Sequence, residues 1–137
     1  MQAIVLPSTP SVTSSKRRWA GIALTALPVA FLTLDALMKV VKIAPVVEAS
    51  ARIGYGESTL RPIGLVLLAS LALYLVRRTS VLGAVLVTAY LGGAVATHVR
   101  LGDPIFTHTL SPVYFAVFLW LGLYLRDTRL RAIVPWR

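Results

Sequence analysis

Residues 61–104 read RPIGLVLLASLALYLVRRTSVLGAVLVTAYLGGAVATHVRLGDP, two apolar runs separated by Arg77 and Arg78. The first run, residues 62–76, would form a helix of about 22 Å, which is short of the ~30 Å hydrocarbon core of a bilayer. Arginine side chains at its two ends can snorkel to make up part of that difference. A soluble helical bundle would need polar residues every third or fourth position, and the middle of neither run has such a stripe.

Two further apolar runs lie on either side of this stretch, at residues 19–41 and 109–126. The chain is 57% hydrophobic and only 14% charged, whereas roughly 25% is usual in a soluble domain. A chain of 137 residues cannot bury so much apolar surface in its own core, so the lipid bilayer is its expected partner. The sequence therefore predicts an all-α fold, an integral membrane four-helix bundle with helices at about 19–41, 61–77, 79–99 and 109–126.

The two flanks of this membrane domain, residues 19–126, are basic. Residues 1–18 are rich in Ser, Thr and Pro and end in Lys16-Arg17-Arg18, and they predict a disordered cytoplasmic tail. Residues 127–137 predict a second basic cytoplasmic tail. A basic stretch before an apolar run could also belong to a cleaved signal peptide. We expect the first run to be retained, because it is long and lacks a small-residue cleavage site.

Short connections force neighbouring helices to run antiparallel, so successive connections alternate between the two sides of the membrane. Nine of the 14 Lys and Arg residues then fall on one side, which also holds both termini. These nine are Lys16, Arg17, Arg18, Arg77, Arg78, Arg126, Arg129, Arg131 and Arg137. Because cytoplasmic connections carry an excess of basic residues, the expected arrangement is a multi-pass protein of the inner (plasma) membrane with both termini in the cytoplasm, N-in and C-in.

Several classes of function find no support in the residues. The net charge of +9 comes from short clusters between apolar runs, without the interleaved aromatic surface of a nucleic-acid binder, so no nucleic acid is expected as partner. The spacing of His98, Asp103 and His108 matches no known metal-binding pattern, and we expect no metal. No nucleophile elbow and no phosphate-binding glycine loop occurs. No residue is therefore assigned a catalytic role.

The predicted topology gathers four of the five acidic residues and both histidines near the outer face. From these residues and the basic residues at the same face we propose a ligand site with five members, Asp35, Lys39, His98, Arg100 and Asp103. Lys and Arg offer hydrogen-bond donors to carbonyl or anionic oxygens, and histidine side chains exchange protons near neutral pH. Each member also has a structural interpretation: an Asp35–Lys39 salt bridge within the first helix, a solvated helix end, or helix capping by Asp103 before Pro104.

Small residues recur every fourth position in the third predicted helix, among them Gly92, Gly93 and Thr97. Small residues at that spacing let helix backbones approach closely in lipid, where no hydrophobic effect drives helix association. These three residues are therefore predicted to pack against a neighbouring helix. Gly102, two residues before Pro104, is expected to permit a turn after the third helix.

The segments DALMKVVKIAPVVEASARIGY (35–55), RPIG (61–64) and YLGGAVATHVRLGDPIFTHTLSPVYF (90–115) resemble the DoxX-like family of small four-helix membrane proteins. The resemblance extends from about Phe31 to Arg131, and its most specific part is GGA-x-x-T-H-x-R-x-GDP. The positions that match the family pattern are Lys39, Pro45, Glu48, Gly54, Gly64, Gly92, Gly93, Thr97, His98, Arg100, Gly102, Asp103 and Pro104. Two positions depart from it: Leu67 stands where relatives commonly carry a glutamate, and Arg77 where a proline often follows the helix.

The resemblance implies a four-helix membrane bundle, and two kinds of function. Some members of the family are subunits of thiosulfate:quinone oxidoreductase or partners of membrane oxidoreductases, which implies an accessory protein that binds a small polar or quinone-like ligand. Others are assembly chaperones for membrane receptors, which implies an interaction factor with a purely structural polar cluster. A homo-oligomer is a further possible assembly. Leu67 weakens any expectation of a proton relay through the second helix.

Overall fold

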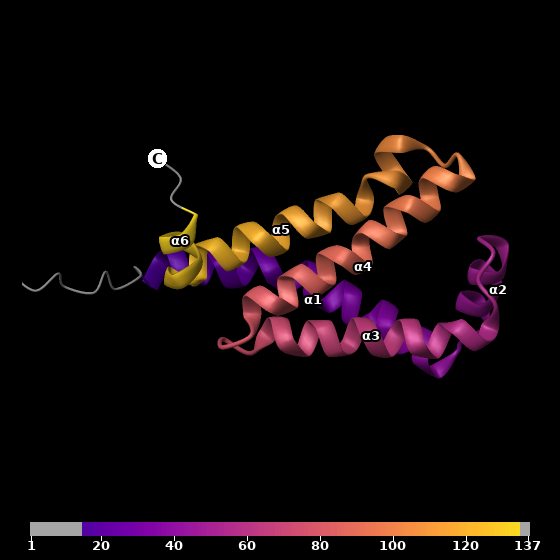
Figure 1. Cartoon of the computed structure of the whole chain (residues 1–137), viewed down its shortest axis with the longest axis horizontal. Helices are drawn as coiled ribbons and strands as arrows, with labels where there is room; N and C mark the ends of the chain where they lie inside the picture. The colour runs from indigo at the N-terminus through magenta and orange to yellow at the C-terminus, as the bar shows by residue number, and fades with distance from the viewer. Residues whose placement is uncertain (1–14, 135–137) are drawn as a thin grey trace, which may run out of the picture.

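A computed structural model describes residues 15–134, and all regular elements in that range are helical. The chain passes four times between two ends (Figure 1). One end carries α2 and the connection between α4 and α5, and is called the α2 end below. The other carries the start of α1, the α3–α4 turn and α6, and is called the α6 end. The elements are α1 (Ser15–Val41), α2 (Ala44–Arg52), α3 (Glu57–Leu75), α4 (Ser80–Leu101), the π-helical turn η1 (Ile105–Thr109), α5 (Ser111–Arg126) and α6 (Thr128–Ile133).

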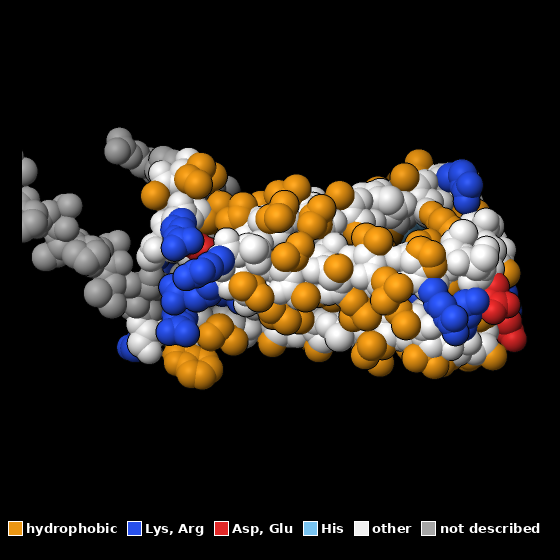
Figure 2. All heavy atoms as spheres, turned by 60° about the horizontal axis from the view of Figure 1, so that its bottom comes forward, with side chains coloured by type: hydrophobic (Ala, Val, Ile, Leu, Met, Phe, Trp, Pro, Cys, Tyr) orange, Lys and Arg blue, Asp and Glu red, His pale blue; other side chains and the backbone are white. Residues whose placement is uncertain are grey.

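Four helical segments in the described range are long and apolar enough to cross a membrane, which confirms the predicted fold class. They are Ser15–Val41, Glu57–Leu75, Ser80–Leu101 and Ile105–Arg126. Figure 2 shows hydrophobic side chains over the middle of the molecule and Lys and Arg side chains at its two ends. Large apolar side chains that stay exposed, such as Leu27, Leu65 and Val66, therefore face lipid rather than water.

Several predicted helix boundaries differ from the observed ones. α1 begins at Ser15, so Lys16-Arg17-Arg18 extends the first helix instead of ending a tail; residues 1–14 lie outside the described range. Lysine and arginine favour helix, and their long side chains reach the interface from a helix that protrudes. α3 begins at Glu57, whose charge suits a helix N-terminus, and its 19 residues reach about 28 Å. The second helix is therefore not as short as residues 62–76 suggested.

Two short helices were not predicted. α2 lies in the first connection, where Pro45 occupies its first turn. α6 occupies residues predicted as tail: the Asp127 carboxylate caps it by accepting a hydrogen bond from the Arg129 amide at 2.8 Å. Leu130 of α6 then lies against the hydrophobic core, only 6% exposed. The predicted tail 127–137 is thus helical over Thr128–Ile133, and residues 135–137 lie outside the described range.

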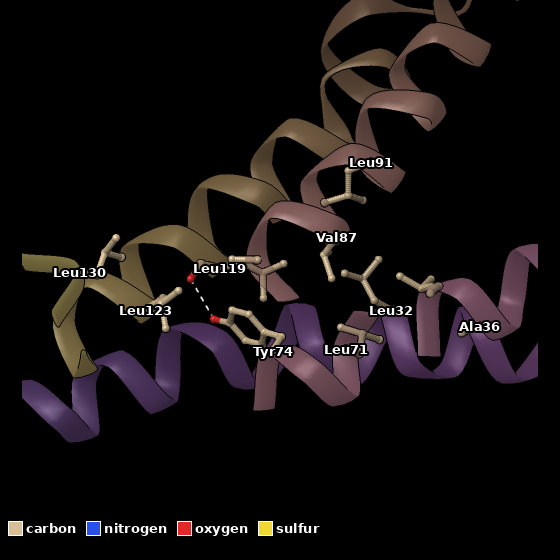
Figure 3. Packing of buried hydrophobic residues seen from close by; sticks show 11 residues of the cluster. Leu32, Ala36, Leu71, Tyr74, Val87, Leu91, Leu119, Leu123 and Leu130 are labelled. Carbon is tan, nitrogen blue, oxygen red and sulfur yellow. Dashed lines mark hydrogen bonds between the residues drawn. The ribbon is translucent and has the colours of Figure 1, made fainter. Parts of the chain in front are cut away.

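The closely packed part of the bundle lies toward the α6 end. Tyr74 is fully buried there, and its hydroxyl donates a hydrogen bond of 2.8 Å to the Leu119 carbonyl (Figure 3). Glycines allow the backbones to meet: a Cβ on Gly83 would lie 2.1 Å from the Tyr74 amide nitrogen, and one on Gly21 2.7 Å from the Gly122 carbonyl oxygen. These contacts fix α3 against α4 and α1 against α5.

The predicted packing role of Gly92 and Gly93 is wrong, because a Cβ at either position would meet nothing within 4 Å. The third member, Thr97, is buried but is held by hydrogen bonds rather than by a helix seam. The helix pairs explain the difference: α1 and α4 each contact α3 and α5, and the α4–α5 pair leans away from the α1–α3 pair toward the α2 end (Figure 1). The glycines lie in the half where the helices diverge.

Candidate functional site

A cavity of about 760 Å³ occupies the α2 half of the bundle. Its walls come from α1, α3, α4 and α5, and the chain between α2 and α3 contributes its rim. Five polar residues carry the argument below, and the rest of the lining is mainly apolar. The five are Asp35, Lys39, Tyr55, Thr97 and His98. Three of the five residues predicted for the ligand site, Asp35, Lys39 and His98, therefore line one cavity.

The first polar pair belongs to α1. Lys39 follows Asp35 by one helical turn, and its ammonium group bonds both carboxylate oxygens. The side chains are 18% and 27% exposed, so both charges are largely withdrawn from solvent. An aspartate within a membrane span needs such a partner, because an unpaired charge there is costly. The predicted pairing is confirmed, and it presents the cavity with a compact dipole of almost no net charge.

The second pair joins α4 to the connection that follows it. His98 Nδ1 lies 2.7 Å from Asp103 Oδ2. Gly102 makes this contact possible: its φ of 70° is left-handed and turns the chain back at the end of α4. Capping by Asp103 is not observed, because the carboxylate bonds the imidazole and Pro104, not Asp103, precedes η1. Asp103 thus orients His98 without lining the cavity itself.

A third pair crosses between segments far apart in sequence and was not predicted. The Tyr55 hydroxyl lies 2.9 Å from Thr97 Oγ1. Thr97 donates its own proton to the Gly93 carbonyl at 2.9 Å, so Tyr55 is the donor to Thr97. The left-handed Gly54, at a φ of 88°, brings Tyr55 to this position. The sequence held one signal for it, since Tyr55 ends the family-like segment 35–55.

Arg100 lies apart from the other predicted site residues. It does not line the cavity, and its Nη2 donates a hydrogen bond of 2.9 Å to the Ile53 carbonyl. A guanidinium group that binds a carbonyl in the α2–α3 connection ties the end of α4 to that connection. The structure therefore favours an architectural role for Arg100, which supports the rim that carries Tyr55.

The deeper part of the cavity is apolar. Phe31 lies eight residues before Lys39, about 12 Å further along the helix, and its ring stacks on Phe115 of α5 at a centroid distance of 4.9 Å. Leu32 of α1 and Ala89 of α4, nine residues before His98, line the same region. Gly93 also lines it, and a Cβ at that position would meet nothing within 4 Å. The cavity is consequently polar at the α2 end and apolar toward the bundle centre.

The donor set does not suggest a metal site. Within residues 15–134 no three His, Asp or Glu side chains come together as metal ligands. The rings of His98 and His108 meet edge to face with centroids 6.0 Å apart, and His108 Nδ1 is bonded to its neighbour Thr107. What the cavity offers instead is a set of hydrogen-bonding groups beside an apolar space, which matches an amphiphilic organic molecule better than an ion.

Among the comparisons with known proteins, only the one with protein-family models gave a match. A family model described as the DoxX-like family matches residues 23–122. No curated protein and no solved structure matches the chain. The matched range includes all five polar residues of the cavity. It covers α3 and α4 completely and α5 as far as Gly122.

Proposed function

The chain belongs to the DoxX-like family, and we propose that it is an accessory membrane protein that binds a quinone-like amphiphile in the cavity of its α2 half. The protein would serve a membrane oxidoreductase by holding this ligand, and the chemistry of electron transfer would belong to the partner. No residue of the chain is assigned a catalytic role. In the proposed orientation the α2 end faces outward and both termini lie in the cytoplasm, as the distribution of Lys and Arg favours.

One observation carries the proposal: the division of the cavity into a polar rim and an apolar interior. A quinone head group has two carbonyl oxygens that accept hydrogen bonds, and its tail is hydrocarbon. Its head would lie beside the Asp35–Lys39 and His98–Asp103 pairs. Its tail would lie against Phe31, and beyond it against lipid.

The polar rim suits a neutral acceptor rather than a strong anion. Lys39 is the one cationic side chain in the lining, and Asp35 balances its charge. His98 has one ring nitrogen engaged with Asp103, and among the described residues its other nitrogen has no hydrogen-bond partner. That nitrogen can accept a hydrogen bond when the ring is neutral and donate one when it is protonated. It could therefore bond either a carbonyl oxygen or the hydroxyl of the reduced form.

Leu67 argues against proton transfer through α3. Its side chain is fully buried in the hydrophobic core cluster, where relatives of the family commonly carry a glutamate. A leucine cannot pass a proton between the cavity and the α6 half. The proposal accordingly stops at ligand binding and includes no proton transfer through α3.

Adjacent glycines on α4 provide a matched test of binding. Gly93→Leu would place a bulky side chain in the cavity, whereas Gly92→Leu would place the same side chain outside its lining, and neither Cβ meets an obstacle. For protein in nanodiscs, we expect the Kd for a short-chain quinone such as decylubiquinone to rise roughly ten- to a hundredfold in G93L, the effect of overfilling a cavity. G92L should bind like wild type, as measured by equilibrium binding.

The outcomes separate the two functions suggested by the family. Saturable binding that G93L alone weakens supports the ligand site. An absence of saturable binding by well-folded wild-type protein would contradict it. The polar pairs and the Arg100–Ile53 hydrogen bond would then only hold the bundle together, as expected for the other candidate, an assembly factor. A partner whose maturation fails without this protein would identify that role.

A further inference from the structure

A second, smaller cavity of about 190 Å³ lies at the α6 end, opposite the proposed ligand site. Three arginines from three different segments line it: Arg18 of α1, Arg77 of the α3–α4 turn and Arg126 at the end of α5. A single water needs a cavity volume of only about 10–15 Å³, so this cavity has room for a group of several atoms. The presence of three arginine residues around such a space is a feature that the proposed function does not use.

Arg126 is held in place before any ligand arrives. Its guanidinium carbon lies 4.7 Å from the centre of the Tyr74 ring, and its Nη2 donates a long hydrogen bond of 3.5 Å to the Tyr74 carbonyl. These contacts leave most of the five donors of the guanidinium group for other partners. A preorganised arginine loses less conformational freedom when it binds an oxyanion, and its planar fork fits phosphate oxygens.

The one carboxylate in the lining does not cancel this positive charge. Asp127 Oδ1 accepts from the Arg129 amide at 2.8 Å, and Oδ2 lies 3.3 Å from the Ser80 hydroxyl. The carboxylate is therefore engaged at the start of α6, and the lining holds three cationic residues against one anionic residue. The remaining lining includes Leu75, which is 57% exposed on the outer side of the bundle.

We infer that this cavity binds a phosphate group, and that the phosphate belongs to an anionic phospholipid of the same membrane. The position favours a lipid as the source of the phosphate: the arginines lie where membrane-spanning helices end, and an exposed apolar side chain adjoins them. Basic pockets between spans at the cytoplasmic side suit anionic headgroups, and each basic residue near the surface strengthens that attraction. This site would be independent of the ligand proposed for the α2 half.

The sequence supplies a closely matched pair of double variants. R18Q/R77Q removes two arginines that line the cavity, and R17Q/R78Q removes their immediate neighbours, which do not line it. Both lose the same charge and residue types, and Arg126 with its contacts to Tyr74 is retained in each. Purified full-length protein in neutral nanodiscs of phosphatidylcholine would be titrated with phosphatidylglycerol, and bound lipid counted by native mass spectrometry.

We expect wild-type protein to retain phosphatidylglycerol over phosphatidylcholine, and R18Q/R77Q to bind it at least about tenfold more weakly than R17Q/R78Q. Equal weakening in the two doubles would show diffuse surface attraction and overturn the site, as would an absence of preference in wild type. Competition by millimolar inorganic phosphate would support the same phosphate chemistry with a soluble source. If R18Q/R77Q does not fold, the single variant R77Q against R78Q and the wild-type lipid preference decide the question.

Discussion

Replacing Gly83 with alanine is expected to lower the free energy of unfolding by at least about 3 kcal/mol, the upper end of the usual cost of overpacking. The new Cβ would lie 2.1 Å from the Tyr74 amide nitrogen and 2.4 Å from its Cα. Backbone atoms cannot rotate away as a side chain can, so α4 would have to move off α3. That movement would also disturb Tyr74, whose hydroxyl binds the Leu119 carbonyl in the core.

The control is the same substitution nine residues later on the same helix. Gly92→Ala meets nothing within 4 Å, and it should raise the stability by up to about 1 kcal/mol because alanine favours helix over glycine. Reversible unfolding of both variants in mixed micelles, followed by circular dichroism, would compare them. Equal stabilities would show that α3 and α4 do not meet at Gly83 as the structure has them.

The second large effect is expected at the α1 ion pair. Asp35→Asn leaves the Lys39 ammonium without its partner in a membrane span. Lys39→Met likewise leaves the Asp35 carboxylate without a partner. Each single variant should lose about 2.5–3.5 kcal/mol, the cost of an unpaired charge in a span. The double variant D35N/K39M contains neither charge, and its stability should return to within about 1 kcal/mol of wild type. Unfolding in micelles measures all four proteins.

Ligand binding separates a structural pair from a functional one. The stable double variant should still bind a short-chain quinone at least about tenfold more weakly than wild type, because a donor group of the rim has gone. Full binding by D35N/K39M would assign the pair to architecture alone. Single variants that are as stable as wild type would show that the charges are solvated rather than paired.

The elements that the sequence predicted are those that depend on local pattern. An apolar run of sufficient length identifies a membrane-spanning helix, and two charged residues four apart identify the Asp35–Lys39 pair. The short helices were not predicted because they lack such a local pattern. α2 and α6 lie in polar or mixed segments, and what holds α6 in place is Leu130 packed against the core, a tertiary contact with no local signature.

The glycines show most clearly that close contacts between helices cannot be predicted from a single sequence. Gly83 and Gly122 meet a neighbouring backbone, whereas Gly92 and Gly93 do not, although the latter have the more conspicuous small-residue spacing. Close approach depends on how two helices cross, and the spacing along one helix does not determine the crossing. The Tyr55–Thr97 contact, between residues 42 apart, is hidden for the same reason. Arg100 lies at the predicted end of the molecule, and its hydrogen bond to the Ile53 carbonyl, 47 residues away in sequence, is another contact without a local signature.

Photolabelling by an azido-substituted quinone tests the proposed ligand site most directly. In nanodiscs, the labelled residues found by mass spectrometry should lie in α1 and α4 within the cavity lining, near residues 31–39 and 89–98. Excess decylubiquinone should remove this labelling, and so should the G93L variant. Label confined to lipid-facing residues outside the lining, equal in wild type and G93L and indifferent to competitor, would contradict the site.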